Sequence, residues 1–173
     1  RVDLPLWVYN IPHTVKTAVA PETVASLASE GAIVGVKDSS GAGELLAQLN
    51  VLCEQGELSL LRFLGTVFRI TSAGSLGTHG VIPGIANLVP EICARGWEAG
   101  ESGDSETTRE CNAQLMVASK IQGVAKSGIT GIKAALNLMG VLDDDTVSRP
   151  MHPLTPEEKQ KIQSILKDLD LLN

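Results

Sequence analysis

Four short apolar runs in the first half of the chain are separated by longer segments of helical length. The runs, rich in Leu, Val, Ile and aromatic residues, are 4–10, 32–37, 58–65 and 80–87. Short apolar runs bounded by turn residues predict buried β-strands. Segment 43–56 repeats apolar residues at helical spacing, 20–30 opens with Pro21 and Glu22, and 66–77 is a shorter helix candidate. Strands that alternate with helices in this way predict an α/β protein with parallel strands.

The second half of the chain is predicted to be helical, because no strand-like run follows residue 87. Helices are expected over 90–123, with a polar break near 100–105, over 128–140, and over 155–172. The last helix has the strongest start signal: Thr155 as N-cap, Pro156 as first residue and Glu158 completing a capping box. Its start is therefore the best-defined boundary in the sequence.

Composition narrows the class of protein further. The formal net charge is −6 without a basic stripe, which disfavours a nucleic-acid partner. No apolar run approaches the ~20 residues that span a bilayer, so no membrane association is expected. Three widely spaced cysteines without a CxxC pair disfavour a metal site or a disulfide framework. The expected location is therefore the reducing cytoplasm. The missing initiator methionine suggests a chain that begins inside a larger protein.

Reactive residues stand where the predicted strands end. Parallel α/β folds gather functional residues at the C-terminal ends of strands. The run "AIVGV" ends in Lys37, and an amine in apolar surroundings becomes a better nucleophile because burial disfavours its charged form. Tyr9, the only tyrosine, ends the first run, and its hydroxyl can relay protons. Backbone N–H groups of Gly65 and Gly84, at the later ends, suit a carboxylate.

Less specific interpretations compete with this one. A lysine at a strand end is usually solvated, and a lone tyrosine near a turn usually packs half-buried. His79 lacks a nearby acidic or cysteine partner and is interpreted as structural, whereas His13 lies just beyond Tyr9 and could face the same pocket. The acidic triplet at 143–145 is interpreted as a solvated loop.

Three motifs in order resemble a known family. They are "VYNIP", Lys37 in "GVKDSSG" 28 residues after Tyr9, and "GVIPGIANLVPE". In these residues the chain resembles the dihydrodipicolinate synthase and N-acetylneuraminate lyase family of class I, Schiff-base pyruvate aldolases. The resemblance extends into the tail through "IKAALNLMG" and "SRPMHPLTPEE".

The resemblance implies a (β/α)8 barrel with a C-terminal helical extension, of which this chain is the second half, strands five to eight. Residues 1–88 would form a half barrel of four βα units, with the last helix running on from residue 88. Residues 89–173 would form that final barrel helix and the extension. The N-terminal half of the barrel would be absent.

By the same resemblance Lys37 forms a Schiff base with pyruvate or another 2-oxo acid, and Tyr9 shuttles protons. Substrate-binding positions would be Gly65, Ile82, Ser39, Thr14 and Gly84. The protonated imine acts as the electron sink, so no metal or organic cofactor is required. A homo-oligomer, often a tetramer in the family, is implied.

Departures from the family pattern narrow the range of expected substrates. Dipicolinate synthases resemble Tyr-Asn-x-Pro-x-Arg, but the arginine position is Thr14, which cannot form a bidentate charged pair with a carboxylate. Lys16 could replace that charge. Sialic-acid lyases resemble Gly-x-Asp-Glu where this chain reads Gly65-Thr66-Val67-Phe68. A 2-keto-3-deoxy sugar acid or 4-hydroxy-2-oxoglutarate is therefore the preferred substrate.

Two alternatives stay open. One is 4-hydroxy-tetrahydrodipicolinate synthase, which condenses pyruvate with aspartate semialdehyde, and the other is a catalytically silent binding or structural protein. The family's Thr-Thr carboxylate loop and second tyrosine would lie upstream of Arg1. This segment alone is therefore expected to be inactive and marginally stable.

Overall fold

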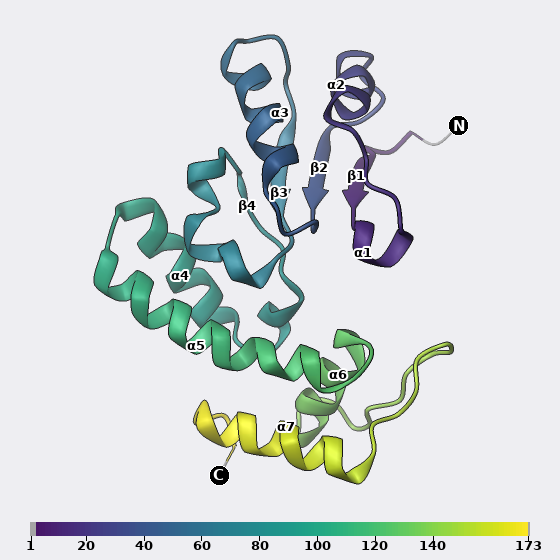
Figure 1. The fold of residues 1–173 in the computed structure, drawn as a ribbon, viewed down its shortest axis with the longest axis vertical. Helices are drawn as coiled ribbons and strands as arrows, with labels where there is room; N and C mark the ends of the chain where they lie inside the picture. Colours follow the sequence, from purple (N-terminus) through teal and green to yellow (C-terminus); the bar gives the residue numbers. More distant parts are fainter. Residues whose placement is uncertain (1–2, 173) are drawn as a thin grey trace. The chain divides into compact units, whose positions relative to one another are not determined.

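The structure, a computed structural model, describes residues 3–172, so the outermost residues of the two expected domains lie outside the described part. The chain forms two compact units (Figure 1). The first is the chain up to Pro83 together with Trp97–Ser105, and the second is Gly84–Gly96 together with the chain from Glu106 onward. The division at residue 88, which followed the repeat units of a barrel, stays a prediction.

A parallel four-stranded sheet is the centre of the first unit. Its strands are β1 (Trp7–Asn10), β2 (Gly35–Asp38), β3 (Leu61–Leu64) and β4 (Gly80–Val81), in the order β1-β2-β3-β4. All three pairings are parallel. The predicted α/β fold with a parallel sheet is confirmed, whereas its assignment to barrel strands five to eight stays a prediction.

Helices cover one face of this sheet. Helix α2 (Pro21–Ser29) follows β1 and helix α3 (Glu44–Glu54) follows β2 (Figure 1). Fully buried residues from these helices and from the strands form one core, with members Val24, Val36, Leu46, Leu49 and Leu64. Because strand side chains alternate between faces, the even-numbered residues of β2 and β3 point into this core.

The odd-numbered residues form the opposite face of the sheet, which is aromatic and largely exposed. The Trp7 and Phe63 rings lie with centroids 5.4 Å apart across the sheet. Between them, Gly35 leaves the space that the Trp7 ring occupies, since a Cβ on Gly35 would lie 2.6 Å from that ring. Trp7 and Leu61 are 40% and 43% exposed.

Two elements differ from their sequence-based predictions. Segment 66–77 forms two 3-10 turns, η1 (Val67–Ser72) and η2 (Gly74–Leu76), because its Gly, Ser and Thr residues are poor α-helix formers. The expected strand 80–87 stops at Val81 and continues as η3 (Gly84–Asn87). Pro83 cannot donate to a strand ladder, which accounts for the early end. A short helix, α1 (Pro12–Val15), was not predicted.

The remaining elements are helical, as predicted. They are α4 (Pro90–Ser102), whose residues divide between the two units, α5 (Ser105–Val124), α6 (Gly128–Leu138) and α7 (Pro156–Asp168). Helices α5 and α6 approach closely at Gly131, where a Cβ would lie 2.3 Å from the Ile121 carbonyl oxygen. A side chain at that position would push the two helices apart.

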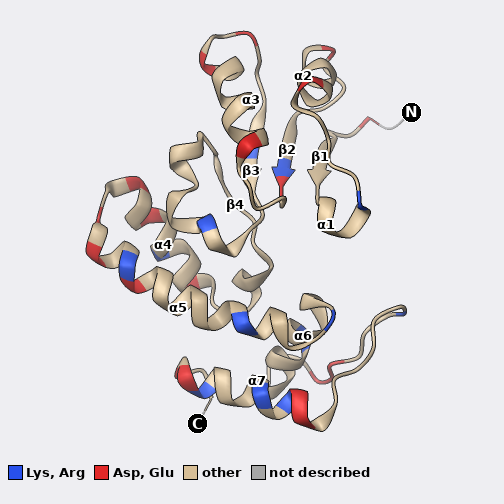
Figure 2. Cartoon of the chain, viewed as in Figure 1, with Lys and Arg blue, Asp and Glu red and all other residues tan. Residues whose placement is uncertain are grey.

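The predicted start of α7 is confirmed in detail. The backbone N–H of Glu158 donates to Thr155 Oγ1 at 3.2 Å, and the backbone N–H of Thr155 donates to Glu158 Oε2 at 2.9 Å. Acidic residues occupy the first turn and Lys167 the last (Figure 2), which complements the helix dipole. This start was predictable because its determinants are local.

Candidate active site

Lys37 and Tyr9 meet at the C-terminal edge of the sheet. They are register partners on the adjacent parallel strands β1 and β2, so their side chains leave the same face. Lys37 Nζ lies over the Tyr9 ring, 4.5 Å from the ring centroid. The lysine is half-buried and Tyr9 is 51% exposed. A primary amine and a phenolic hydroxyl are therefore held together at an edge that a small molecule can reach.

Ser39 and Gly65 complete the surroundings of the amine. A Cβ on Gly65 would lie 2.0 Å from Ser39 Oγ and 2.8 Å from Lys37 Cε, so only glycine fits there without displacing them. Ser39 Oγ is buried and makes no hydrogen bond within the described part of the chain. Buried hydroxyls nearly always have a partner, so this oxygen can bond to an ordered water or to a ligand that reaches it.

The other predicted site residues lie on loops that follow the strands. Thr14 is exposed on α1, directly after β1, and Lys16 ends that helix with its Nζ donating to the His13 carbonyl at 2.7 Å. Ile82 is 47% exposed, and its N–H donates to the Leu64 carbonyl at the end of β3. Gly84 opens η3 in the second unit. Their substrate-binding roles stay predictions.

Sequence reasoning missed a polar pair on the helix-covered face. Asn10 and Asp38, which follow Tyr9 and Lys37, are 3% and 0% exposed. Asn10 Nδ2 donates to Asp38 Oδ1 at 2.7 Å. The available signal was the alternation: each residue ends a strand at a position whose side chain must face the core.

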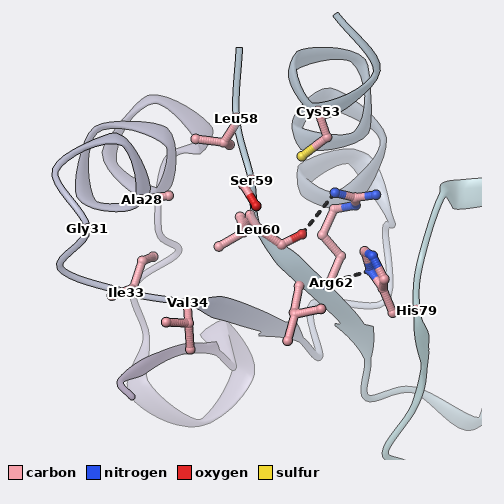
Figure 3. Close-up of a pocket in the computed structure, with 11 residues that line it drawn as sticks. Ala28, Gly31, Ile33, Val34, Cys53, Leu58, Ser59, Leu60, Arg62 and His79 are labelled. Atoms are coloured by element: carbon pink, nitrogen blue, oxygen red, sulfur yellow. Dashed lines mark hydrogen bonds between the residues drawn. The ribbon is translucent and has the colours of Figure 1, made fainter. Parts of the chain in front are cut away.

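A cavity of about 620 Å³ lies at the opposite edge of the sheet, at the N-terminal ends of β2 and β3 (Figure 3). Its polar lining includes Arg62 and His79, and the backbone N–H of Arg62 donates to His79 Nδ1 at 3.1 Å. His79 thus has a structural hydrogen bond, as its sequence context predicted. The cavity is separate from the edge that carries Lys37.

The clearest electrostatic perturbation belongs to the second unit. Burial, followed by the neighbouring Cys111 sulfur, raises the pKa of the Cys93 thiol to about 11. Cys111 accepts a hydrogen bond from Arg95 Nε at 3.2 Å. All three cysteines are free thiols.

Residues 3–172 lack two features that would change the class of site. No group of three or more His, Cys, Asp or Glu side chains is arranged to hold a metal ion there. Nor does any helix within those bounds combine the length and hydropathy needed to cross a bilayer.

Comparison with known proteins assigns the class. The family model described as the dihydrodipicolinate synthetase family matches residues 1–169, and the chain belongs to this family. It is 30% identical over 171 residues to the 4-hydroxy-tetrahydrodipicolinate synthases of Desulfotalea psychrophila and Geobacter metallireducens. These alignments cover 99% of this chain but only 56% and 57% of the relatives.

Solved structures agree with the sequence comparison. The dihydrodipicolinate synthase of Thermotoga maritima superposes with a TM-score of 0.86 at 28% identity, over 99% of this chain and 58% of that one. The enzyme of Bacteroides thetaiotaomicron gives a TM-score of 0.86 at 29% identity, over 97% and 57%. The chain therefore spans little more than half the length of its relatives.

Proposed function

We propose that the protein is a lyase that forms a Schiff base between Lys37 and pyruvate or another 2-oxo acid. The observation that supports this most directly is the Lys37 amine over the Tyr9 ring, 4.5 Å from its centroid, at the C-terminal edge of a parallel sheet. Family membership gives independent support. The orphaned Ser39 hydroxyl offers a hydrogen-bond partner for a substrate oxygen.

Imine formation can be written with groups present at this edge. The Lys37 amine attacks the ketone carbon of the 2-oxo acid, and loss of water from the carbinolamine leaves an imine. The Tyr9 hydroxyl donates and accepts the protons of these steps. With a 4-hydroxy-2-oxo acid, the C4 hydroxyl gives its proton to the Tyr9 oxygen and the C3–C4 bond breaks. The electron pair of that bond moves toward the protonated imine, so an aldehyde is released and an enamine remains on Lys37. Protonation and hydrolysis of the enamine return free Lys37.

The proposed substrate is a 2-keto-3-deoxy sugar acid or 4-hydroxy-2-oxoglutarate. Thr14 supports this choice, because an uncharged exposed side chain gives no bidentate partner for the carboxylate of aspartate semialdehyde. The second candidate is 4-hydroxy-tetrahydrodipicolinate synthase, and the similarity to synthases of that name favours it. A silent binding protein is the alternative of another class.

Borohydride trapping tests the proposal. Incubation with pyruvate and borohydride should add the mass of a reduced pyruvyl group to the protein, and Lys37→Ala should abolish the adduct. Lys16→Ala is the matched control, because Lys16 is an exposed lysine whose Nζ donates to the nearby His13 carbonyl. A silent binder would leave no adduct, and an unchanged adduct in Lys37→Ala would exclude Lys37 as the nucleophile.

The exposed face of the sheet bears on turnover by this chain alone. Large side chains with apolar character on it or at its edge are at least 40% exposed, among them Trp7, Tyr9, Leu61 and Ile82. Such a patch favours association. We expect residues 1–173 alone to associate and to lack turnover, as gel filtration and a steady-state assay will check. A stable, active monomer would contradict this expectation. We also propose that the protein is cytoplasmic and forms a homo-oligomer.

A further inference from the structure

A buried hydrogen bond joins β1 and β2 directly behind the lysine. Asn10 and Asp38 are register partners, one position after the register partners Tyr9 and Lys37. Consecutive strand residues point to opposite faces. The Asn10–Asp38 bond therefore lies on the helix-covered face, while the amine and the phenol lie on the open face of the same two strands.

The Asp38 carboxylate is held from three directions. Oδ1 accepts from Asn10 Nδ2 at 2.7 Å and from the Ser40 backbone N–H at 3.0 Å, and Oδ2 accepts from Ser40 Oγ at 2.8 Å. Asn10 is fixed in turn, because its Oδ1 accepts from the Val19 N–H at 3.1 Å. The Asp38 carboxylate is fully buried, so the loss of one of these donors would leave a costly unpaired group. The donors therefore hold the carboxylate in one position.

Backbone hydrogen bonds connect Asn10 and Asp38 to the loops that surround the Lys37 side chain. The Ser39 N–H donates to the Asn10 carbonyl at 2.8 Å, and the Gly65 N–H donates to the Asp38 carbonyl at 2.8 Å. The two residues that surround the Lys37 side chain are thus anchored to Asn10 and Asp38. Asp38 is joined to Lys37 by one peptide unit, and Asn10 is joined to Tyr9 in the same way. Movement of either buried residue would therefore be transmitted to one member of the Tyr9–Lys37 pair.

We propose that Asp38 and Asn10 are positioning residues that hold the Tyr9 ring against the Lys37 amine. The catalytic consequence rests on the proposed function, whereas the positioning itself does not. Without the buried bond the ends of β1 and β2 can separate, and the phenol and the amine lose alignment. Misplacement of reacting groups by about 1 Å can cost about 100-fold in rate.

A second buried polar network provides a matched control. Arg62 is 8% exposed and donates to the carbonyls of Gly77 and Leu60 and to Asn50 Oδ1, at 2.9, 3.0 and 3.2 Å. It lies at the cavity on the other edge of the sheet (Figure 3). Arg62→Met therefore removes a comparable buried network without touching the Lys37 edge.

The direct test is the NMR chemical shift of the Lys37 Cε protons, which the Tyr9 ring shields in the intact protein. The signal is assigned by its loss in Lys37→Ala. Asp38→Asn and Asn10→Ala should move it downfield toward the value in Tyr9→Leu, and Arg62→Met should leave it in place. The exchanged double variant Asn10→Asp/Asp38→Asn should restore it, because the pair again holds one amide and one carboxylate.

A shift unchanged from wild type in folded Asp38→Asn and Asn10→Ala would overturn the inference. If Asp38→Asn does not fold, Asn10→Ala decides alone, because it keeps both Ser40 bonds to Asp38. The second readout is the rate of pyruvate trapping. Asp38→Asn should lower its maximum about 10- to 100-fold, with the half-saturating pyruvate concentration less affected.

Different results would contradict the Schiff-base function and the positioning role of Asp38 and Asn10. A wild-type protein that traps no pyruvate contradicts the proposed function, and the chemical shifts still decide whether Asp38 positions Lys37. If the wild type traps pyruvate and Asp38→Asn traps it at the same rate, the positioning role of Asp38 is overturned. The Schiff base at Lys37 is then still supported.

Discussion

Tyr9 and Lys37 stand directly opposite each other on adjacent parallel strands, with the lysine Nζ 4.5 Å from the centroid of the tyrosine ring. The contact places the lysine amine over an aromatic face at an edge where both strands end. Nearness and orientation are thus set by strand register rather than by flexible loops.

Tyr9→Phe separates the ring from the hydroxyl. The ring contact with Lys37 should survive, because Phe presents the same face to the amine, but the proton relay is lost. We expect pyruvate trapping at Lys37 to slow about 100-fold, the lower range for a positioned acid–base group. Rapid-quench mass spectrometry measures the rate. Tyr9→Leu, which also removes the ring, should be slower still, and equal rates for wild type and Tyr9→Phe would exclude the hydroxyl from the reaction.

Gly65→Ala should disturb both stability and the site. The new methyl would overlap Ser39 Oγ and crowd Lys37 Cε. Overpacking of this kind costs about 1–3 kcal/mol in the free energy of unfolding, and the lysine should trap pyruvate about tenfold more slowly. Urea unfolding and trapping rates provide the two measurements. Gly123→Ala is the control: apart from its own helix backbone and chain neighbours, no atom lies within 4 Å of the new methyl, so the trapping rate should stay near wild type and the stability should not fall.

In a full-length protein that contains this chain, Thr14→Arg should raise kcat/KM toward aspartate semialdehyde. A bidentate arginine–carboxylate pair is worth about 1.5–3 kcal/mol, which corresponds to roughly 10- to 100-fold. The comparison is a steady-state assay of both proteins with the semialdehyde and with 2-keto-3-deoxy acids. Thr14→Gln is the uncharged control. A wild-type preference for the semialdehyde would reverse our ranking of the two substrates.

Cys93 should make stability fall at high pH. Its pKa is raised from the ordinary 9.0 to about 11 in the folded protein, so the folded state keeps a proton that the unfolded state loses. Stability is therefore complete below pH 9 and decreases as the pH rises through 11, by about 2–3 kcal/mol at most. Urea unfolding at several pH values should show a smaller decrease for Cys93→Ala. Cys53→Ala, which changes a half-buried thiol in the first unit, should keep the wild-type decrease.

Strand ends were predictable because their signals are local and chemical. Lys37 and Tyr9 were placed by the apolar runs before them, and the start of α7 by its capping residues. The bounds of β4 were not predictable from hydrophobicity alone, since residues 80–87 are apolar whether they pair or turn. The decisive factor was Pro83, which removes a ladder donor.

The buried Asn10–Asp38 pair lay beyond sequence reasoning for another reason. Hydrophobic periodicity records which positions are apolar, and both residues count as polar interruptions at the end of a strand. Only the register reveals that the two interruptions face each other and satisfy one another's hydrogen bonds. The orphaned Ser39 hydroxyl likewise depends on the approach of Gly65, 26 residues later in the chain.

The two tryptophans of the chain lie in contrasting surroundings. Trp7 is 40% exposed on the open face of the sheet, whereas Trp97 packs against the core of the helix-covered face. The molecule thus carries its own optical probe. In a Trp97→Phe background, the emission and iodide quenching of Trp7 would report solvent and ligand at the face that carries Lys37, without any attached dye.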